Sequence, residues 1–428
     1  MKFMNVLRRA AAALFLLALP GAARAQACPE PAAIKGDLTD PLAVVRYLAD
    51  DALEGRLAGS PGEACAADYI AGRFATLGLR AAGEDGTFFQ AVPLASRLNP
   101  HAPAGSGRNV IALLEGTDPD LRDEIVVIGA HYDHLGHGQI GSLAPEERGA
   151  IHNGADDNAS GVAVMIRAST LLADAPPARS ILFLAFTGEE SGLLGSAHFV
   201  REPTLALAGA RAMLNLDMVG RLGDGPLIVY GVETAAEWRA LLESEGERTG
   251  VELALRPEGY GPSDHTSFYT ADIPVLHFFT NTHGDYHRPS DEWDRIDADG
   301  LETVARIVTA IAGQAASPPT TLTLQRGAGQ PARGAAPAGY GAWLGTVPDF
   351  SPVERGVLLG GVTPGSPGDR AGLQRGDLLI RFAGEDVTDL EAFTAVLRRH
   401  RPGDEVEVVV LRDAGEVTLR AVLGSRGG

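Results

Sequence analysis

Four apolar runs in the first 290 residues each end in acidic or histidine side chains, and this pattern restricts the fold more than any other feature of the chain. Runs that are apolar throughout are typical of parallel strands buried on both faces. Parallel strands end at one edge of a sheet, so the polar residues that follow them are expected to converge there. The runs are EIVVIGAHYD (124–133), SILFLAFTGEE (180–190), ARAMLNLDMVG (210–220) and PVLHFFTNTHGDYH (274–287).

Segments with helical spacing of apolar residues alternate with these runs between residues 41 and 315. Examples are DPLAVVRYLADDAL (40–53), GEACAADYIAGRFATLGL (62–79) and VAVMIRASTLLADA (162–175). Alternation of strands and helices is typical of α/β proteins. We therefore predict an α/β fold with a mixed, mainly parallel sheet that carries helices on both faces.

The acids and histidines lie in five short segments: AHYDH (130–134), GADDNASG (154–161), TGEES (187–191), NLDM (215–218) and YHRPSD (286–291). A single such residue after a strand more often caps a helix or bonds within a loop. Five in this order instead indicate a pair of zinc ions bridged by a carboxylate, because imidazole and carboxylate groups are usual zinc ligands. The expected ligands are His131, Asp157, Glu190, Asp217 and His287, with a sixth acid, Glu189, beside one of them.

This set of segments resembles the co-catalytic di-zinc aminopeptidases, relatives of aminopeptidase Y and of the transferrin-receptor-like peptidases, over roughly residues 37–316. The resemblance implies that Asp157 is the bridging carboxylate, since it precedes Ser160 and Gly161 as in the family's D-x-x-S-G pattern. It also implies the remaining roles: His131 and Asp217 on one zinc, Glu190 and His287 on the other, and proton transfer by Glu189.

Chemistry alone gives the same division of roles between the two adjacent glutamates. A water between two zinc ions has a lowered pKa, and a carboxylate that is not a ligand can take its proton and pass it to the leaving amine. Asp133 is placed to accept a hydrogen bond from the His131 nitrogen that faces away from the metal. Tyr286 precedes His287, as a tyrosine does in some family members. It either donates a hydrogen bond to the oxyanion of the tetrahedral intermediate or is a packing residue.

The other histidines are expected to lie outside the metal ligand set, because the five ligands already complete it. His134, His137 and His152 lie between the first two ligands, and His265 lies in SDHTSFY (263–269), which recurs in the family and should shape the pocket. We interpret His277 and His283 as a strand and a loop residue.

Residues 1–25, MKFMNVLRRAAAALFLLALPGAARA, have the three parts of a secretory signal: basic residues, an apolar stretch and a small-x-small cleavage site. The apolar stretch is short for a membrane span, although an uncleaved N-terminal anchor is the alternative. We expect cleavage before Gln26 and export to the periplasm or the extracellular space. Cys28 and Cys65 then form a disulfide, or remain as a reactive and a buried thiol.

Cleavage would remove four basic residues and no acid, which takes the formal net charge from −19 to −23. Such an acidic chain is a poor candidate for binding nucleic acid or anionic membrane surfaces. At 428 residues the chain should also hold more than one domain, since single cores rarely grow past about 250–300 residues. Residues 317–339, rich in Pro, Gly and Ala, are the expected linker between a peptidase domain (37–316) and a second module.

Residues 340–424 resemble a PDZ domain of the bacterial type. The most specific segment is SPGDRAGLQRGDLLI (366–380), and a helix over 388–400 and strands over 405–412 and 416–423 follow it. The resemblance implies that a peptide C-terminus binds to the backbone amides of one loop while the extended peptide adds to the sheet edge. The alternative is that the module packs on the first domain or dimerises. The loop consists of Ala342, Trp343, Leu344 and Gly345.

The sequence therefore predicts an exported zinc aminopeptidase with two Zn²⁺ per chain, in which a metal-bound hydroxide attacks the first peptide carbonyl and Glu189 moves the proton. A carboxypeptidase or dipeptidase on the same metals would need a basic group such as Arg221 or Arg288. A peptide-binding adaptor that acts through the PDZ module is a further alternative. A receptor-like relative would have lost ligands, and a glutaminyl-cyclase-like transferase uses a single zinc; the intact ligand set argues against both.

Overall fold

The computed structural model describes residue 28 and residues 40–94, 105–139, 141–147, 149–325, 342–349, 353, 355–362, 365–388, 390–397, 399–412 and 415–424. The predicted signal segment and residues 326–339 of the predicted linker lie outside these ranges. Within them, no helix is long and apolar enough to cross a membrane.

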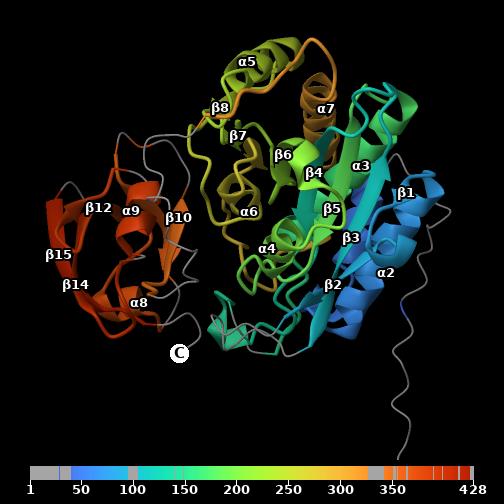
Figure 1. Cartoon of the computed structure of the whole chain (residues 1–428). Coiled ribbons are helices and arrows are strands. Elements are labelled where there is room, and N and C mark those ends of the chain that lie inside the picture. Colours follow the sequence, from blue (N-terminus) through green and yellow to red (C-terminus); the bar gives the residue numbers. More distant parts are fainter. Residues whose placement is uncertain are drawn as a thin grey trace, which may run out of the picture.

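A nine-stranded sheet in the order β1-β3-β5-β4-β6-β9-β7-β8, with β2 paired to β3, forms the first domain (Figure 1). Its central strands β5, β4, β6 and β9 run parallel, and these are the four apolar runs of the sequence. β3 and β7 flank them in antiparallel orientation. The strands are β1 (Arg80–Ala81), β2 (Phe89–Pro93), β3 (Ser106–Leu114), β4 (Ile125–His131), β5 (Ser180–Phe186), β6 (Ala210–Leu216), β7 (Leu227–Tyr230), β8 (Leu253–Leu255) and β9 (Val275–Phe279).

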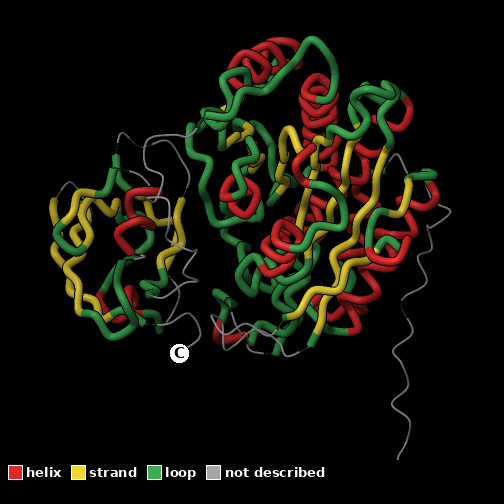
Figure 2. Tube along the Cα trace, in the orientation of Figure 1, coloured by secondary structure: helices red, strands yellow, loops and turns green. Residues whose placement is uncertain are grey.

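Helices cover both faces of this sheet, which Figure 2 shows as red coils on either side of the yellow strands. Strand residues alternate between two cores: Val126 and Ile128 pack with α1, α2, α3 and α7, whereas Val127 packs with α4 and α6. The predicted α/β fold with a mixed, mainly parallel sheet is therefore confirmed. The helices are α1 (Pro41–Leu48), α2 (Pro61–Thr76), α3 (Gly161–Asp174), α4 (Leu194–Arg201), α5 (Trp238–Thr249), α6 (His265–Thr270) and α7 (Ala298–Ala315).

Local sequence signals explain where several helices begin. Asp40, Ser60 and Asp297 each precede a helix and accept a hydrogen bond from one of its first backbone amides. Proline follows the first two caps, at the helix position where its missing N–H is not needed. A disulfide joins Cys28 to Cys65 of α2, so the structure contains the first of the two cysteine alternatives.

The second domain is a six-stranded antiparallel sheet with its own apolar core around Phe382, Phe393 and Val408. The sequence predicts a small α+β PDZ-like domain here, and this prediction is confirmed by the antiparallel sheet and its helices α8 and α9. β10 lies at one edge of the sheet and pairs with β11 alone. The elements are β10 (Thr346–Asp349), β11 (Val357–Val362), α8 (Pro367–Ala371), β12 (Leu378–Phe382), β13 (Glu385–Asp386), α9 (Leu390–Leu397), β14 (Glu405–Arg412) and β15 (Gly415–Val422).

Arg56 connects three parts of the first domain from a fully buried position, at the end of a short 3-10 helix (Asp51–Arg56). Its guanidinium donates to the carbonyls of Leu48, Tyr132, Asn153 and Gly154. Burial lowers its pKa to about 10, which still leaves the side chain charged at neutral pH. The side chain therefore holds the end of α1 and two loops at the C-terminal edge of the sheet in one arrangement.

We predict that Arg56→Met lowers the free energy of unfolding by about 3 kcal/mol or more, because buried carbonyls left without donors cost about 1–3 kcal/mol each. Arg56→Lys should give an intermediate loss, since an ammonium group reaches fewer of the four carbonyls. Urea unfolding of the full chain measures the effect. Arg46→Met, at an exposed position on α1, is the control. A loss for Arg56→Met no larger than for the control would show that Arg56 does not hold these segments.

Candidate metal centre

The six acids and histidines predicted from the sequence meet at the C-terminal edge of the parallel strands. His131 is the last residue of β4, Asp217 follows β6 directly, and Glu189 and Glu190 follow β5. His287 lies in the loop after β9. Asp157 comes from the turn that leads into α3. The fold thus places the ligands as the strand-end argument requires.

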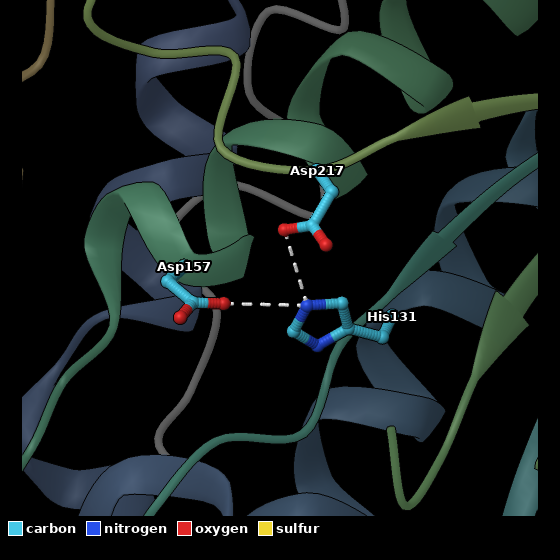
Figure 3. A group of neighbouring side chains, drawn as sticks. All are labelled: His131, Asp157 and Asp217. Atoms are coloured by element: carbon cyan, nitrogen blue, oxygen red, sulfur yellow. Dashed lines mark hydrogen bonds and ion pairs between the residues drawn. The ribbon is translucent and has the colours of Figure 1, made fainter. Parts of the chain in front are cut away.

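One half of the centre consists of His131, Asp157 and Asp217 (Figure 3). The His131 Nε2 atom lies 3.3 Å from Asp157 Oδ1 and 3.4 Å from Asp217 Oδ1. His131 and Asp157 are 1% and 3% exposed, so these groups face one another in a protein interior. The Nε2 atom of His131 and one carboxylate oxygen each of Asp157 and Asp217 therefore surround one point.

The other half uses the second oxygen of Asp157. His287 Nε2 lies 3.2 Å from Asp157 Oδ2 and 3.3 Å from Glu190 Oε2. The His287 Nδ1 atom faces away and bonds to the Gly141 carbonyl at 2.9 Å. Asp157 therefore directs its two oxygens to two different histidines, each of which has a second acid beside it.

These distances fit metal ligands. Zinc bonds of 2.0–2.2 Å at tetrahedral angles place neighbouring ligand atoms about 3.3–3.5 Å apart. The four histidine–carboxylate distances, 3.2 to 3.4 Å, match that spacing and exceed a charge-assisted hydrogen bond of about 2.7–2.9 Å. The donor set, imidazole and carboxylate, also suits zinc. The residues present thus fit two adjacent metal positions that share Asp157.

Mutual charge stabilises these groups. Burial by itself would lower the pKa of His131 and His287, but the surrounding carboxylates raise both well above the usual value. Burial opposes ionisation of the two acids as well, yet the histidines hold the pKa of Asp157 well below its usual range and that of Glu190 at about 2. The carboxylates are therefore ionised, as ligands must be.

Glu189 differs from Glu190 although the two are adjacent. Burial, together with the charges of Glu190, Asp217 and Asp264, raises the pKa of Glu189 well above its usual value, against the opposing effect of His131. Its side chain lines the same cavity as the ligands. A carboxyl group of this kind can take and return a proton, which is what a general acid–base group needs.

Asp133 departs from the prediction in one respect. The His131 Nδ1 atom bonds to the backbone carbonyl of Asp133 at 3.2 Å, while the Asp133 carboxylate is 3.8 Å away. That carboxylate instead accepts the backbone N–H of Glu189 at 3.1 Å. Burial raises its pKa to about 8. The predicted hydrogen bond is therefore replaced by one to the main chain, and Asp133 positions the glutamate segment.

The cavity beside the centre is lined by acids and histidines together with a few apolar residues. Tyr286 lines it and stacks on the His287 ring with centroids 3.9 Å apart, which is the packing contact; its oxyanion role remains a prediction. Ser263 lines it too, whereas Asp264 and His265 of the same segment are fully buried. Among the described residues the lining contains no arginine or lysine: His131, Asp157, Glu189, Glu190, Asp217, Met218, Pro262, Ser263, His277, Phe279, Thr282, Tyr286 and His287.

Two supporting residues were not recognised from the sequence. Asp291 accepts the backbone N–H groups of Asp156 and Asp157 at 2.9 and 3.1 Å and pairs with Arg221 at 2.9 Å. His134, which was expected to lie outside the ligand set, bonds to Glu190 at 2.8 Å. Both residues lie in segments that the sequence singles out, YHRPSD and AHYDH. The spacing of residues along the chain does not indicate which groups they bond to.

The predicted PDZ loop is partly occupied by the chain itself. The Trp343 N–H donates to the Gly424 carbonyl, and the Trp343 carbonyl accepts from Gly424. Gly345 has a left-handed φ of 85°, and a Cβ there would meet the Ser366 side chain at 2.1 Å. The Trp343 amide is therefore engaged within the chain.

Comparison with known proteins finds a matching family for each of the two domains. Residues 109–312 match the model of peptidase family M28, and residues 348–423 match the PDZ domain. Aminopeptidase YwaD of Bacillus subtilis is 31% identical over 200 residues, which are 44% of this chain and 40% of that protein. This chain thus spans less than half the length of that curated relative.

Solved structures share the fold at low identity. A zinc aminopeptidase from Bacillus subtilis superposes with a TM-score of 0.51 at 18% identity, covering 66% of this chain and 96% of that one. A glutaminyl cyclase from Porphyromonas gingivalis gives 0.53 at 19%, covering 64% and 97%. The fold alone therefore does not separate these activities. The family matches and the metal-centre geometry together identify residues 109–312 as a domain of peptidase family M28 and residues 348–423 as a PDZ domain.

Proposed function

We propose that this chain is a zinc-dependent aminopeptidase that removes N-terminal residues from peptides. The observation that carries the proposal is Asp157, whose two oxygens face His131 and His287 and so define two adjacent metal positions. Asp217 completes the first position and Glu190 the second. Membership of family M28 supports the same activity.

Two zinc ions bound there would act as Lewis acids on the scissile carbonyl and on the attacking water. The protein residues supply orientation and proton transfer. Glu189, which lines the cavity and is not needed as a ligand, takes the proton of the attacking water and delivers it to the departing amine nitrogen. Asp133 fixes the Glu189 backbone through its hydrogen bond to the amide.

The lining of the cavity favours the amino end of a peptide over its carboxyl end. The two zinc ions would offset the charge of their ligands, and among the described residues the lining contains no arginine or lysine that could pair with a free carboxylate. The carboxyl group of Glu189, which is not a ligand, can accept a hydrogen bond from an α-amino group. The two arginines that would serve a carboxypeptidase are engaged elsewhere. Arg221 pairs with Asp285 and Asp291, and Arg288 lies 3.8 Å from Glu146.

The apolar wall of the cavity suggests the side chain that is accepted. Met218 and Phe279 pack with Ile228 in a small apolar cluster, and both line the cavity next to the metal positions. An N-terminal residue with an apolar side chain buries that side chain there, whereas an acidic one would lose its hydration without gaining a basic partner. We therefore propose leucine-like N-terminal residues as preferred substrates.

The PDZ domain is proposed to bind peptide C-termini. β10 is an edge strand, so an extended peptide can add to it by main-chain hydrogen bonds while the 342–345 loop receives the carboxylate. Export to the periplasm or the extracellular space is proposed as well. The signal pattern of residues 1–25 and the Cys28–Cys65 disulfide support it, since disulfides persist mainly in oxidising compartments.

We predict that Glu189→Gln lowers kcat for a leucyl reporter about 10²- to 10⁴-fold, because the general acid–base group is lost. Binding of two zinc ions should be unchanged, since Glu189 is not a ligand. Glu202→Gln, at a side chain that is 63% exposed, is the control. Wild-type residues 26–428 should lose activity to a chelator and should not cleave the N-acetylated reporter.

Other outcomes of that assay select the alternatives. Equal cleavage of the acetylated reporter, together with cleavage of C-terminally free peptides, would favour a carboxypeptidase or dipeptidase. Cyclisation of an N-terminal glutamine would point to the transferase. Absence of any hydrolysis by the zinc-loaded chain would leave the peptide-binding adaptor.

For the PDZ domain we predict that a decapeptide library with free C-terminal carboxylates binds the full chain, and that the amidated library does not. Gly345→Ala should weaken binding at least about tenfold, because its Cβ would displace Ser366 from the loop. Gly384→Ala, at a turn with a similar φ of 82° and open space, controls for backbone strain. Equal binding of both libraries in a fluorescence polarisation assay would contradict carboxylate recognition.

For export we predict that the full chain expressed in a Gram-negative host is recovered from the periplasm or medium with Gln26 as its first residue. Edman sequencing and a thiol-labelling assay for Cys28 and Cys65 measure this. Recovery from the membrane fraction with residues 1–25 attached would support the uncleaved anchor instead. A cytoplasmic chain with two labelled thiols would contradict export altogether.

A further inference from the structure

His134 lies in the interior beside the second metal position. It follows His131 by three residues, is 0% exposed, and is held by a backbone hydrogen bond from its N–H to the Arg56 carbonyl. Gly154 makes room for the imidazole, because a Cβ on this glycine would lie 2.5 Å from two ring atoms. The site is thus shaped around a histidine at this position.

The ring has one partner for its two nitrogens. Nδ1 lies 2.8 Å from Glu190 Oε1, whereas Nε2 is buried with no hydrogen-bond partner among the described residues. The other Glu190 oxygen, Oε2, faces His287 at 3.3 Å. Each oxygen of the Glu190 carboxylate therefore contacts a different histidine. The two imidazole rings meet edge to face, with centroids 5.7 Å apart.

The distance between His134 and Glu190 shows whether His134 is a metal ligand or a hydrogen-bond donor to a ligand. It could join Asp157 and Glu190 around an ion, since the three lie close enough to hold one. Ligands that share an ion are spaced by about 3.3–3.5 Å, and the His287–Glu190 contact of 3.3 Å lies in this range. The His134–Glu190 contact of 2.8 Å is shorter and is a charge-assisted hydrogen bond. An ionised carboxylate only accepts, so the proton of this bond is on Nδ1.

We infer that His134 is a positioning residue that holds Glu190 by an Nδ1–H···Oε1 hydrogen bond and so turns Oε2 toward the second metal position. The inference rests on the proposed di-metal function and deepens it. Three residues of segment 131–134 then contribute to the centre. His131 provides a ligand, Asp133 fixes the amide of Glu189, and His134 fixes the carboxylate of Glu190.

Substitutions at this position distinguish a donor from a ligand. The side-chain amide nitrogen of asparagine occupies the place of histidine Nδ1 and donates a hydrogen bond, but it is a poor zinc ligand. Leucine fills similar space with neither property, and glutamine places its amide too far along the side chain. His137→Leu is the matched control, because His137 bonds to the Gly149 carbonyl within the same loop and not to a residue of the metal centre as far as the chain is described.

Zinc affinity of the metal-stripped full chain, measured by competition with a chromophoric chelator, is the readout. We expect two ions per wild-type chain, and about 10- to 100-fold weaker binding of one of them in His134→Leu, the usual loss when a hydrogen-bonded partner of a ligand is removed. His134→Asn should restore that affinity to within a few-fold. The His137→Leu chain should bind as the wild type does.

Each outcome decides a different point. Unchanged affinity in His134→Leu overturns the inference, and equal weakening by asparagine and leucine overturns it in favour of a direct ligand. If His134→Leu does not fold, asparagine and glutamine are compared, and equal affinities for these two overturn it. A wild-type chain that binds fewer than two ions refutes the proposed di-metal centre, independently of His134.

Discussion

The shared carboxylate of Asp157 is the interaction on which the rest of the site depends. It is 3% exposed and faces two histidines, so its position sets the distance between the two halves of the centre. A buried carboxylate must be held by partners to stay ionised. Asp291 fixes the backbone of residues 156 and 157, and Arg56 fixes residues 153 and 154 just before them. Together these contacts fix the turn that carries Asp157.

The backbone near the ligands is strained in a way that the sheet can support. Met218 follows Asp217 with a φ of 52°, and His287 itself has a φ of 54°. Non-glycine residues in this region cost about 1–3 kcal/mol and persist only where surroundings fix them. The Asp217 amide donates to Phe278 of β9 and the Thr280 amide donates to the Met218 carbonyl, so the ends of the parallel strands fix Met218. His287 is fixed instead by residues 141–143, because its carbonyl accepts from the Leu143 amide and its Nδ1 atom bonds to the Gly141 carbonyl.

The sequence allowed the sheet and the set of ligands to be predicted, because both depend on patterns along the chain. Apolar runs marked β4, β5, β6 and β9, and the polar residues after them converge by the geometry of parallel strands. The partners of His131 Nδ1 and of His134 could not be predicted in this way. Each depends on side-chain rotamers and on differences of a few tenths of an ångström in distance, and the partner of His134 is also far away in the sequence. Arg56 was missed because its four acceptors are carbonyls, which carry no residue identity.

Glu189 and Glu190 show most clearly why neighbours decide chemistry. The two side chains are identical and adjacent, yet burial and acids raise the pKa of Glu189, while His287 and His134 help hold that of Glu190 at about 2. Glu189 lies near one imidazole, that of His131, and near several acids, whereas Glu190 accepts contacts from the two imidazoles of His134 and His287. A histidine at 134 adds a second donor on the Glu190 side alone, which increases this difference between the pair. The two roles therefore follow from which side chains β4 and the 287 loop bring opposite each carboxylate.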